Sequence, residues 1–509
     1  MSVEQRLKAL SSSALHGMRR GIEKESLRVR PDGTLALTLH PPALGAALTH
    51  PHITTDFSES QLELITGVHA SVEGCLEELT QIHQAVYRHI GDELLWCASM
   101  PCNLPADHLI PIGRYGTSNV GRAKTVYRLG LAHRYGRRMQ AISGIHYNFS
   151  LPGVTDEQYF GLIRNFRRNS WLLLYLFGAS PAVCSSFVAG RDHELTELEN
   201  GKGEKAGTHY APHATSLRMG RLGYQSDAQA SLRVSYNNLR DYTASLYEAL
   251  TKPYPAYEKI GIRDGDDYRQ LNTTLLQIEN EFYSTIRPKR RIKRGERPLH
   301  ALRERGVEYV EVRLMDLDPF CPIGITPQTC RFLDLFLLQC LLSDSPPDTP
   351  QEINEVRRNL QTVAVRGREP GLALGRNGER ALLANWATEV LAQCAPIPAV
   401  LDAAFGGAAY REAFALAEKL VADAGQAPSA RVLHAMSRNH DNSFVRFVLA
   451  ESTLHKAMLQ HLEFPREVRE RFARLAAESL QKQRELEAAD EVDFETFRER
   501  YLAHDLLRV

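Results

Sequence analysis

The sequence has no excess of charge of either sign. Its 509 residues include 61 Lys and Arg and 61 Asp and Glu, so the formal net charge at pH 7 is zero. A protein without net charge has no overall field that would draw it to nucleic acid or to an anionic membrane surface. We therefore expect neither nucleic acid nor a membrane as a partner, and any charge chemistry has to be local.

The sequence also lacks an apolar run long enough to cross a membrane. Residues 171–190 are uncharged, but Gly178 and Pro181 interrupt them and leave a continuous apolar run only from Trp171 to Phe177. This run is too short for a hydrocarbon layer of about 30 Å, and it predicts a buried helix followed by a turn. The first 20 residues have no continuous apolar core and no cleavage-like site of small residues. We expect a protein without a secretory signal that acts in the cytoplasm.

Several common motifs are missing. The eight cysteines form no Cys-x-x-Cys pair and no Cys/His zinc spacing, which predicts reduced and mostly buried thiols. There is no Walker loop, no Rossmann glycine fingerprint and no internal repeat. The charged glycine loop at residues 201–205 lacks the strand and helix that a phosphate-binding loop needs, so we expect an exposed loop there.

The composition changes near residue 345. Before it, short alternating segments mix with helical ones, whereas residues 345–350 read Ser-Pro-Pro-Asp-Thr-Pro, which is typical of a linker. Beyond it come Ala-, Leu-, Glu- and Arg-rich stretches with helical spacing, such as residues 410–422 and 466–487. We predict a core of residues 1–344 and a mainly helical region of residues 345–509 packed on it.

What the sequence does contain is a set of predicted strands with a polar face. In a strand, alternate residues point to the same side. On this basis the polar faces carry Glu23 and Glu25 in residues 21–29, Gln61 and Glu63 in residues 54–66 with Asp56 in the approach, His146, Asn148 and Ser150 in residues 144–151, Gln277, Glu279, Glu281 and Tyr283 in residues 276–283, and Glu311 and Arg313 in residues 309–314.

A single strand of this kind most often just faces water. Several of them in one α/β chain require a shared sheet, whose apolar side the helices can cover while the polar side forms the wall of a ligand site. Partly buried carboxylates are costly unless paired, and an oxygen-rich group of them suits Mg²⁺. The residues alone leave two interpretations open, a solvated polar face and a metal site, and His146 by itself is more often structural.

Two groups of cations accompany these strands. Residues 115–128 form a glycine- and hydroxyl-rich loop that opens a basic helix, and a helix start of this kind can hold an anion. Residues 287–294 form a basic run directly after the predicted strand 276–283. No aromatic residue interleaves this run, which argues against nucleic-acid binding.

In this order, the segments closely resemble the proteobacterial glutamate–cysteine ligase (γ-glutamylcysteine synthetase) family, type 1. The matching stretches are residues 20–29, 47–50, 53–57, 115–119, 142–152, 175–181, 276–281, 286–290 and 308–313. The likeness is dense over residues 15–325 and loose in the helical third.

The resemblance implies an α+β fold: a glutamine-synthetase-like core with a curled, mainly antiparallel sheet (a half-barrel) covered by helices, plus a helical C-terminal part. It implies ATP-dependent joining of the glutamate side-chain carboxylate to cysteine, the first step of glutathione biosynthesis. Two or three Mg²⁺ ions would assist, with Mn²⁺ able to substitute. The nearest alternative is a related carboxylate–amine ligase with a different acceptor amine. A catalytically silent sensing protein and a metal-dependent hydrolase represent other classes.

The resemblance also assigns roles to residues. It implies metal ligands at Glu23, Glu25, Asp56, Glu63, His146 and Glu311; catalytic arginines at Arg218 and Arg313; a cysteine pocket of Phe57, Tyr127, Leu131, Gln140, Tyr224 and Tyr283; and nucleotide contacts at Arg128, Arg287, Lys289 and Arg290. The implied substrates are L-glutamate, L-cysteine and ATP, acted on by a monomer, with glutathione as a candidate feedback inhibitor.

Overall fold

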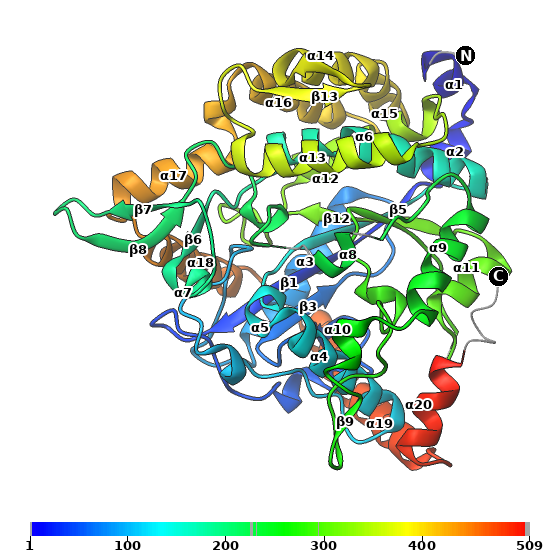
Figure 1. Ribbon diagram of the computed structural model, residues 1–509. Coiled ribbons are helices and arrows are strands. Elements are labelled where there is room, and N and C mark those ends of the chain that lie inside the picture. Colours follow the sequence, from blue (N-terminus) through cyan, green and yellow to red (C-terminus); the bar gives the residue numbers. More distant parts are fainter. Residues whose placement is uncertain (1–2, 224–226, 231, 294, 504–509) are drawn as a thin grey trace.

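A seven-stranded sheet forms the centre of the molecule (Figure 1), seen in a computed structural model that describes residues 3–223, 227–230, 232–293 and 295–503. Its order is β11 (Ile286–Lys289), β12 (Tyr309–Met315), β5 (Ile145–Ser150), β1 (Arg19–Val29), β3 (Gln61–Ile65) and β2 (Ile53–Thr55), with β4 (Leu94–Leu95) paired to β1. Every neighbouring pair is antiparallel. The sheet is open, so the predicted α+β fold with a mainly antiparallel sheet is confirmed.

The register of this sheet brings the predicted polar residues together. Glu23 of β1 lies opposite His146 of β5, and Glu25 of β1 lies opposite Glu63 of β3. Glu311 of β12 lies opposite Asn148, two residues along β5 from His146. Residues directly opposite each other in a sheet share a face, so carboxylates from three strands and an imidazole from a fourth lie on one side.

Helices cover the other side of the sheet. There Ile22, Leu64, Tyr147 and Val312 belong to the main buried apolar cluster. The covering helices are α6 (Asp156–Phe177), which packs on β11 and β12, α3 (Val72–Tyr87), which packs on β1 and β3, and α12 (Pro327–Leu342), which packs on both helices.

The predicted buried helix over Trp171–Phe177 is confirmed as the last part of α6. A capping box at Thr155 precedes this helix, which ends at Phe177 with Gly178 as its C-cap. Within the part of the chain that the structure describes, no helix combines the length and the apolar character that a membrane span requires.

The C-terminal part is mainly helical, as predicted. It contains α13 (Pro350–Arg366), α14 (Leu383–Cys394), α15 (Ile397–Phe405), α16 (Ala409–Ala422), α17 (Pro428–Asn439), α18 (Phe444–His461), α19 (Arg466–Ala488) and α20 (Phe494–Leu502), and a hairpin of β13 (Ala373–Arg376) and β14 (Glu379–Leu382) that the sequence pattern did not indicate. Figure 1 shows α13 to α16 at the top of the view, α17 and α18 at the left, and α19 and α20 at the bottom. One apolar cluster spans residues on both sides of residue 344, and the division there stays a prediction.

The remaining elements connect these layers. They are α1 (Val3–Ala9), α2 (Ser12–His16), α4 (Asn119–Tyr135), α5 (Arg137–Gln140), β6 (Ala182–Cys184), α7 (Ser185–Val188), β7 (Thr196–Glu199), β8 (Lys205–Tyr210), α8 (Asp227–Ala230), α9 (Leu239–Thr251), α10 (Pro255–Glu258), β9 (Arg263–Asp264), β10 (Asp267–Tyr268) and α11 (Pro298–Arg305), with short 3₁₀ turns at Pro42–Leu44, Asp107–Leu109, Leu217–Met219, Glu279–Glu281 and Ala424–Gln426. The loop at residues 201–205 is exposed, and all eight cysteines are free, seven of them buried; both predictions are confirmed.

The strand predicted at residues 276–283 is wrong. The segment forms a 3₁₀ turn at Glu279–Glu281. Glu281 pairs with Arg134 of α4 at 2.9 Å, and Glu279 pairs with Arg297 at 2.8 Å. These buried ion pairs fix the segment against helices instead of in the sheet, and they remove Glu279 and Glu281 from the polar face.

Candidate active site

Acidic side chains and one histidine meet at the centre of the polar face. Ligand atoms of Glu23, His146 and Glu311 lie within 4.8 Å of one another, and so do ligand atoms of Glu25, Glu63 and His146. The His146 Nδ1 atom lies 3.1 Å from Glu23 and 3.9 Å from Glu311, while its Nε2 atom lies 3.7 Å from Glu25. His146 therefore lies between two groups of carboxylates, Glu23 with Glu311 and Glu25 with Glu63, and one ring nitrogen points toward each group.

The two groups differ in their protonation. Burial, with the charge of Asp56 second, raises the pKa of Glu25 to about 8. The same two causes, with Glu23 and Glu25 added, raise the pKa of Glu63 well above its usual value. These shifts also place Asp56 beside this group.

The other group, Glu23 and Glu311, stays ionised. Burial alone would raise the pKa of Glu311, but Lys289 and Arg313 bring it well below its usual value. Burial and the charge of Glu311 both raise the pKa of Glu23. Its hydrogen bond to His146 nevertheless brings this pKa below its usual value. Burial, followed by the charge of Arg313, lowers the pKa of His146, which favours the neutral ring that a metal ligand requires.

This arrangement fits a divalent cation. The pKa values of Glu25 and Glu63 rise because buried carboxylates without enough positive charge around them take up protons. A bound cation would supply that charge, and carboxylate oxygens are the ligands that Mg²⁺ prefers. Asn148 donates to Glu23 at 2.9 Å and would hold this carboxylate in place.

We expect Mg²⁺ binding to release protons near pH 7. The metal-free protein holds protons on Glu25, whose pKa is about 8, and on Glu63, whereas a cation binds the ionised forms. Affinity for Mg²⁺ should therefore rise with pH up to about 8. Calorimetry in two buffers with different ionisation enthalpies measures the protons released.

Glu25→Gln is the matched variant for this experiment. It should release fewer protons and need more Mg²⁺, and an unchanged titration would remove Glu25 from the ligands. In the metal-free protein the same raised pKa gives the opposite trend in stability. The folded chain keeps a proton that the unfolded chain has lost, so the free energy of unfolding should fall as pH rises from the ordinary carboxyl pKa of 4.5 through about 8.

Glu23, Glu25, Glu63, His146 and Glu311 together form the acidic cluster. Arg313 and Arg218 lie next to it. The Nη1 atom of Arg313 is 3.0 Å from Glu311 and 3.4 Å from the Nδ1 atom of His146, and the side chain is partly exposed. Arg218 is buried in the 3₁₀ turn Leu217–Met219, where its Nη2 donates to the backbone carbonyl of Arg313 at 3.0 Å. The structure thus connects both predicted arginines, one at the cluster and one behind it.

Asp316, which the sequence pattern did not single out, supports Arg218. Its carboxylate lies 3.8 Å from the Arg218 guanidinium and accepts hydrogen bonds from Ser216 and from the backbone of Ala179, both at 2.9 Å. Asp316 follows a register shift between Val312 and Met315 in β12, where simple alternation no longer applies. A charged residue directly after the apolar Leu314 and Met315 was the available signal.

The four predicted nucleotide contacts separate into two pairs. Lys289 lies 3.2 Å from Glu311, and Arg128 donates to the backbone carbonyl of Asp56, so both reach the cluster. Arg287 donates to the carbonyls of Asn280 and Phe282. Arg290 donates to the carbonyls of Arg305 and Gly306. Their roles toward a nucleotide remain predictions.

The predicted cysteine-pocket residues come from three parts of the fold. Phe57 is buried directly after Asp56. Tyr127 and Leu131 lie one turn apart on α4, and Gln140 of α5 donates to the hydroxyl of Tyr283 at 2.8 Å. Tyr224 lies outside the described residues. The structure therefore joins Gln140 to Tyr283 directly, and the pocket as a whole stays a prediction.

Known proteins are similar to this chain over nearly its whole length. The model of the glutamate-cysteine ligase family matches residues 5–363. The chain belongs to the glutamate–cysteine ligase family. It is 48% identical to the glutamate–cysteine ligase of Alcanivorax borkumensis over 99% of both chains, and 49% identical to that of Pseudomonas entomophila over 94% of this chain and 92% of the relative.

Solved structures of similar proteins match nine tenths or more of this chain. A crystal structure of glutamate–cysteine ligase from Francisella tularensis in complex with AMP is 37% identical, with a TM-score of 0.90 over 96% of this chain and 98% of that one. A bifunctional glutathione synthetase from Pasteurella multocida is 25% identical, with a TM-score of 0.69 over 90% of this chain and 55% of that one. The helices beyond residue 363 thus belong to a fold shared within the glutamate–cysteine ligase family.

Proposed function

We propose that this chain is a glutamate–cysteine ligase, which forms γ-glutamylcysteine from L-glutamate and L-cysteine and converts ATP to ADP and phosphate. The observation that carries the proposal is the joined set of Glu23, Glu25, Glu63, His146 and Glu311 beside Arg313, in a chain of this family. The AMP bound by the Francisella tularensis relative supports an adenine nucleotide as a substrate.

The proposed reaction has two steps, because a carboxylate and an amine do not condense without activation. The γ-carboxylate oxygen of glutamate attacks the γ-phosphorus of ATP, and ADP leaves. The amine nitrogen of cysteine then attacks the carbonyl carbon of the acyl phosphate, phosphate leaves, and the nitrogen loses a proton. Transition states of this type are stabilised mainly by positioning and by fixed charge.

The chain's own residues supply that charge. The guanidinium of Arg313 can bind phosphoryl or carboxylate oxygens through two parallel donors, and Lys289 adds a point charge at the edge of the cluster. Glu23, Glu25, Asp56, Glu63, His146 and Glu311 would hold two or three Mg²⁺ ions, or Mn²⁺ in their place. When bound, the metal neutralises phosphate charge. The proposal includes a monomer in the cytoplasm and glutathione as a feedback inhibitor.

We expect α-aminobutyrate, which carries a methyl group in place of the thiol, to replace cysteine at reduced efficiency. The predicted pocket of Phe57, Leu131 and tyrosines recognises size and weak polarity. One small group in such a pocket changes kcat/KM by about tenfold or more. Comparing kcat/KM for the two amines checks this. Complete rejection of α-aminobutyrate would show a specific contact with the thiol that this pocket lacks.

The direct test measures ADP release by the purified protein with glutamate, ATP and Mg²⁺, with and without cysteine, while mass spectrometry follows the dipeptide. Cysteine-dependent ADP release matched one-to-one by γ-glutamylcysteine supports the proposal. ADP release with another amine and no dipeptide would keep the chemistry and change the acceptor. No ADP release with any amine would overturn it.

A further inference from the structure

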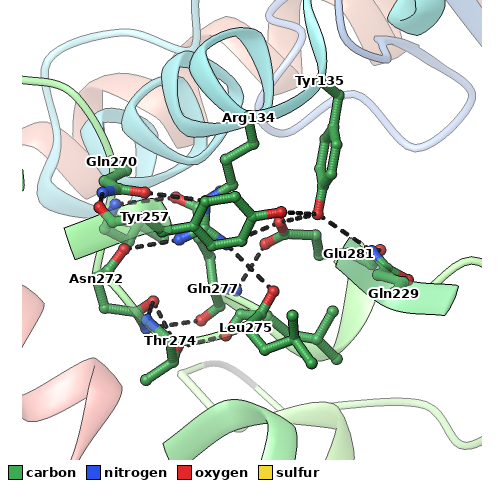
Figure 2. A network of polar contacts seen from close by, with 12 residues as sticks. Arg134, Tyr135, Gln229, Tyr257, Gln270, Asn272, Thr274, Leu275, Gln277 and Glu281 are labelled. Atoms are coloured by element: carbon green, nitrogen blue, oxygen red, sulfur yellow. Dashed lines mark hydrogen bonds and ion pairs between the residues drawn. The ribbon is translucent and has the colours of Figure 1, made fainter. Parts of the chain in front are cut away.

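A buried ion pair fastens the segment that carries Tyr283 to α4. Arg134 and Glu281 are 2.9 Å apart, and neither side chain is exposed to solvent. Figure 2 shows Arg134 and Tyr135 extending from the helix into a network of polar side chains. The hydroxyl of Tyr135 donates to Glu281 at 2.8 Å. Removing one partner of a fully buried ion pair leaves the other charge unpaired, which costs much more free energy than the intact pair contributes. The pair therefore fixes the geometry of this segment.

Gln229 of α8 links this network to the next residues of the segment. Its side-chain amide donates to the hydroxyl of Tyr135 at 3.2 Å and to the backbone carbonyl of Glu281 at 2.8 Å. Its side-chain oxygen accepts from the backbone N–H of Tyr283 at 3.0 Å. One buried glutamine therefore binds the segment on both sides of Phe282. Because these hydrogen bonds lie in the protein interior, the loss of each one costs free energy of folding.

The same connections orient the ring of Tyr283. Its centroid lies 5.8 Å from that of Tyr135, with the rings at 66°. At the far end of the ring the hydroxyl accepts from Gln140 at 2.8 Å. The backbone of Tyr283 is thus held by Gln229, its ring by Tyr135 and its hydroxyl by Gln140. Tyr135 and Gln229 touch each other, so a change at Gln229 is transmitted to both the backbone and the ring.

We propose that Gln229 is a positioning residue for the acceptor amine, acting through the placement of Tyr283. This inference rests on the proposed function, in which Tyr283 and Gln140 line the pocket for cysteine. The hydrogen bonds of Gln229 go to Tyr135, Glu281 and Tyr283 and not to the acidic cluster, where the proposed function places glutamate and the phosphates of ATP. Loss of the hydrogen bonds of Gln229 therefore weakens the binding of the acceptor amine and leaves the binding of glutamate and ATP unchanged.

Gln270 provides a matched control in the same network (Figure 2). It is also buried, and it also makes three side-chain bonds: it accepts from Arg134 at 2.9 Å and donates to the carbonyls of Tyr257 at 2.8 Å and Gly261 at 3.0 Å. None of these bonds reaches Tyr283. A role in folding alone predicts similar effects at Gln229 and Gln270, whereas a positioning role does not.

The experiment compares Gln229→Met and Gln270→Met, each of which keeps the length of the side chain and removes its hydrogen bonds. Both should lower the unfolding temperature. Gln229→Met should raise KM for cysteine about tenfold, the effect of one or two lost hydrogen bonds, with KM for glutamate and ATP unchanged. Gln270→Met should leave KM for cysteine at the wild-type value.

Equal effects of the two variants on KM for cysteine, or an equal rise in KM for glutamate in Gln229→Met, would overturn the inference alone. If the wild type uses another amine, the same comparison is made with that amine. A wild type that releases no ADP with any amine overturns the proposed function and the inference with it. Should Gln229→Met fail to fold, Gln229→Asn, which retains a shorter amide, should show a smaller rise in the same KM, and no rise would count against the proposal.

Discussion

We expect Arg313→Lys to lower kcat by about a hundredfold or more, the usual effect of removing one transition-state donor. The guanidinium of Arg313 lies against both Glu311 and His146, and its two parallel N–H groups can meet two oxygens of a phosphoryl group at once. Lysine keeps the charge, but it offers a single ammonium group on a flexible stem. The loss therefore comes from geometry and appears in kcat at saturating ATP, glutamate and Mg²⁺.

Arg291→Lys is the control for this prediction. Arg291 pairs with Glu308 at 3.0 Å, and most of its side chain is exposed. An exposed pair of this kind contributes little, so we expect unchanged kcat. Normal turnover by Arg313→Lys under the same conditions would show that Arg313 does not stabilise the transition state.

We expect Gly144→Ala to remove most activity and to destabilise the fold. A Cβ atom at this position would overlap the Arg218 guanidinium, with the Arg218 Cζ only 2.6 Å away. Gly144 is also fixed by its neighbour in β1, because its N–H donates to the Glu25 carboxylate at 2.7 Å and its carbonyl accepts from the Glu25 N–H at 3.0 Å. Either Arg218 moves away from Arg313 and Asp316, or β5 moves away from Glu25.

We expect Gly144→Ala to lower kcat by more than about a hundredfold, since both responses disturb charged groups at the cluster. Overpacking of this kind costs about 1–3 kcal/mol in the free energy of unfolding. Turnover and denaturant unfolding measure the two effects. Gly201→Ala, where a Cβ meets no atom within 4 Å, should change neither. Wild-type activity and stability in Gly144→Ala would mean that Arg218 has room to adjust, and its contact with the Arg313 backbone would not matter.

The strands of the polar face could be predicted because each carries its own signal. The alternation in residues 21–29, 144–151 and 309–314 is local, and the structure has strands at all three. What the alternation could not give is the register. That Glu25 lies opposite Glu63 and Glu23 opposite His146 depends on pairing between distant segments. The family resemblance, and not the spacing, predicted that these residues form one site.

Residues 276–283 show where alternation misleads. Their pattern matches that of the true strands, but Glu279 and Glu281 find arginines on other elements, Arg297 and Arg134. An ion pair formed between distant segments outweighs a weak local preference. Gln229 was missed for a related reason, since a lone glutamine in a short segment has no periodic neighbours and gains its importance only from three partners brought in by the fold.

The single imidazole between the two groups of carboxylates would make metal binding at one group depend on metal binding at the other. A neutral ring has one nitrogen with a lone pair and one that carries a hydrogen. Whichever group receives the lone pair of His146, the other faces an N–H, which repels a cation. A first ion bound by either group would select the tautomer of His146, and His146 would then not serve as a ligand for a second ion in the other group. The two positions should fill in order, with the second ion bound more weakly and exchanged more readily than the first.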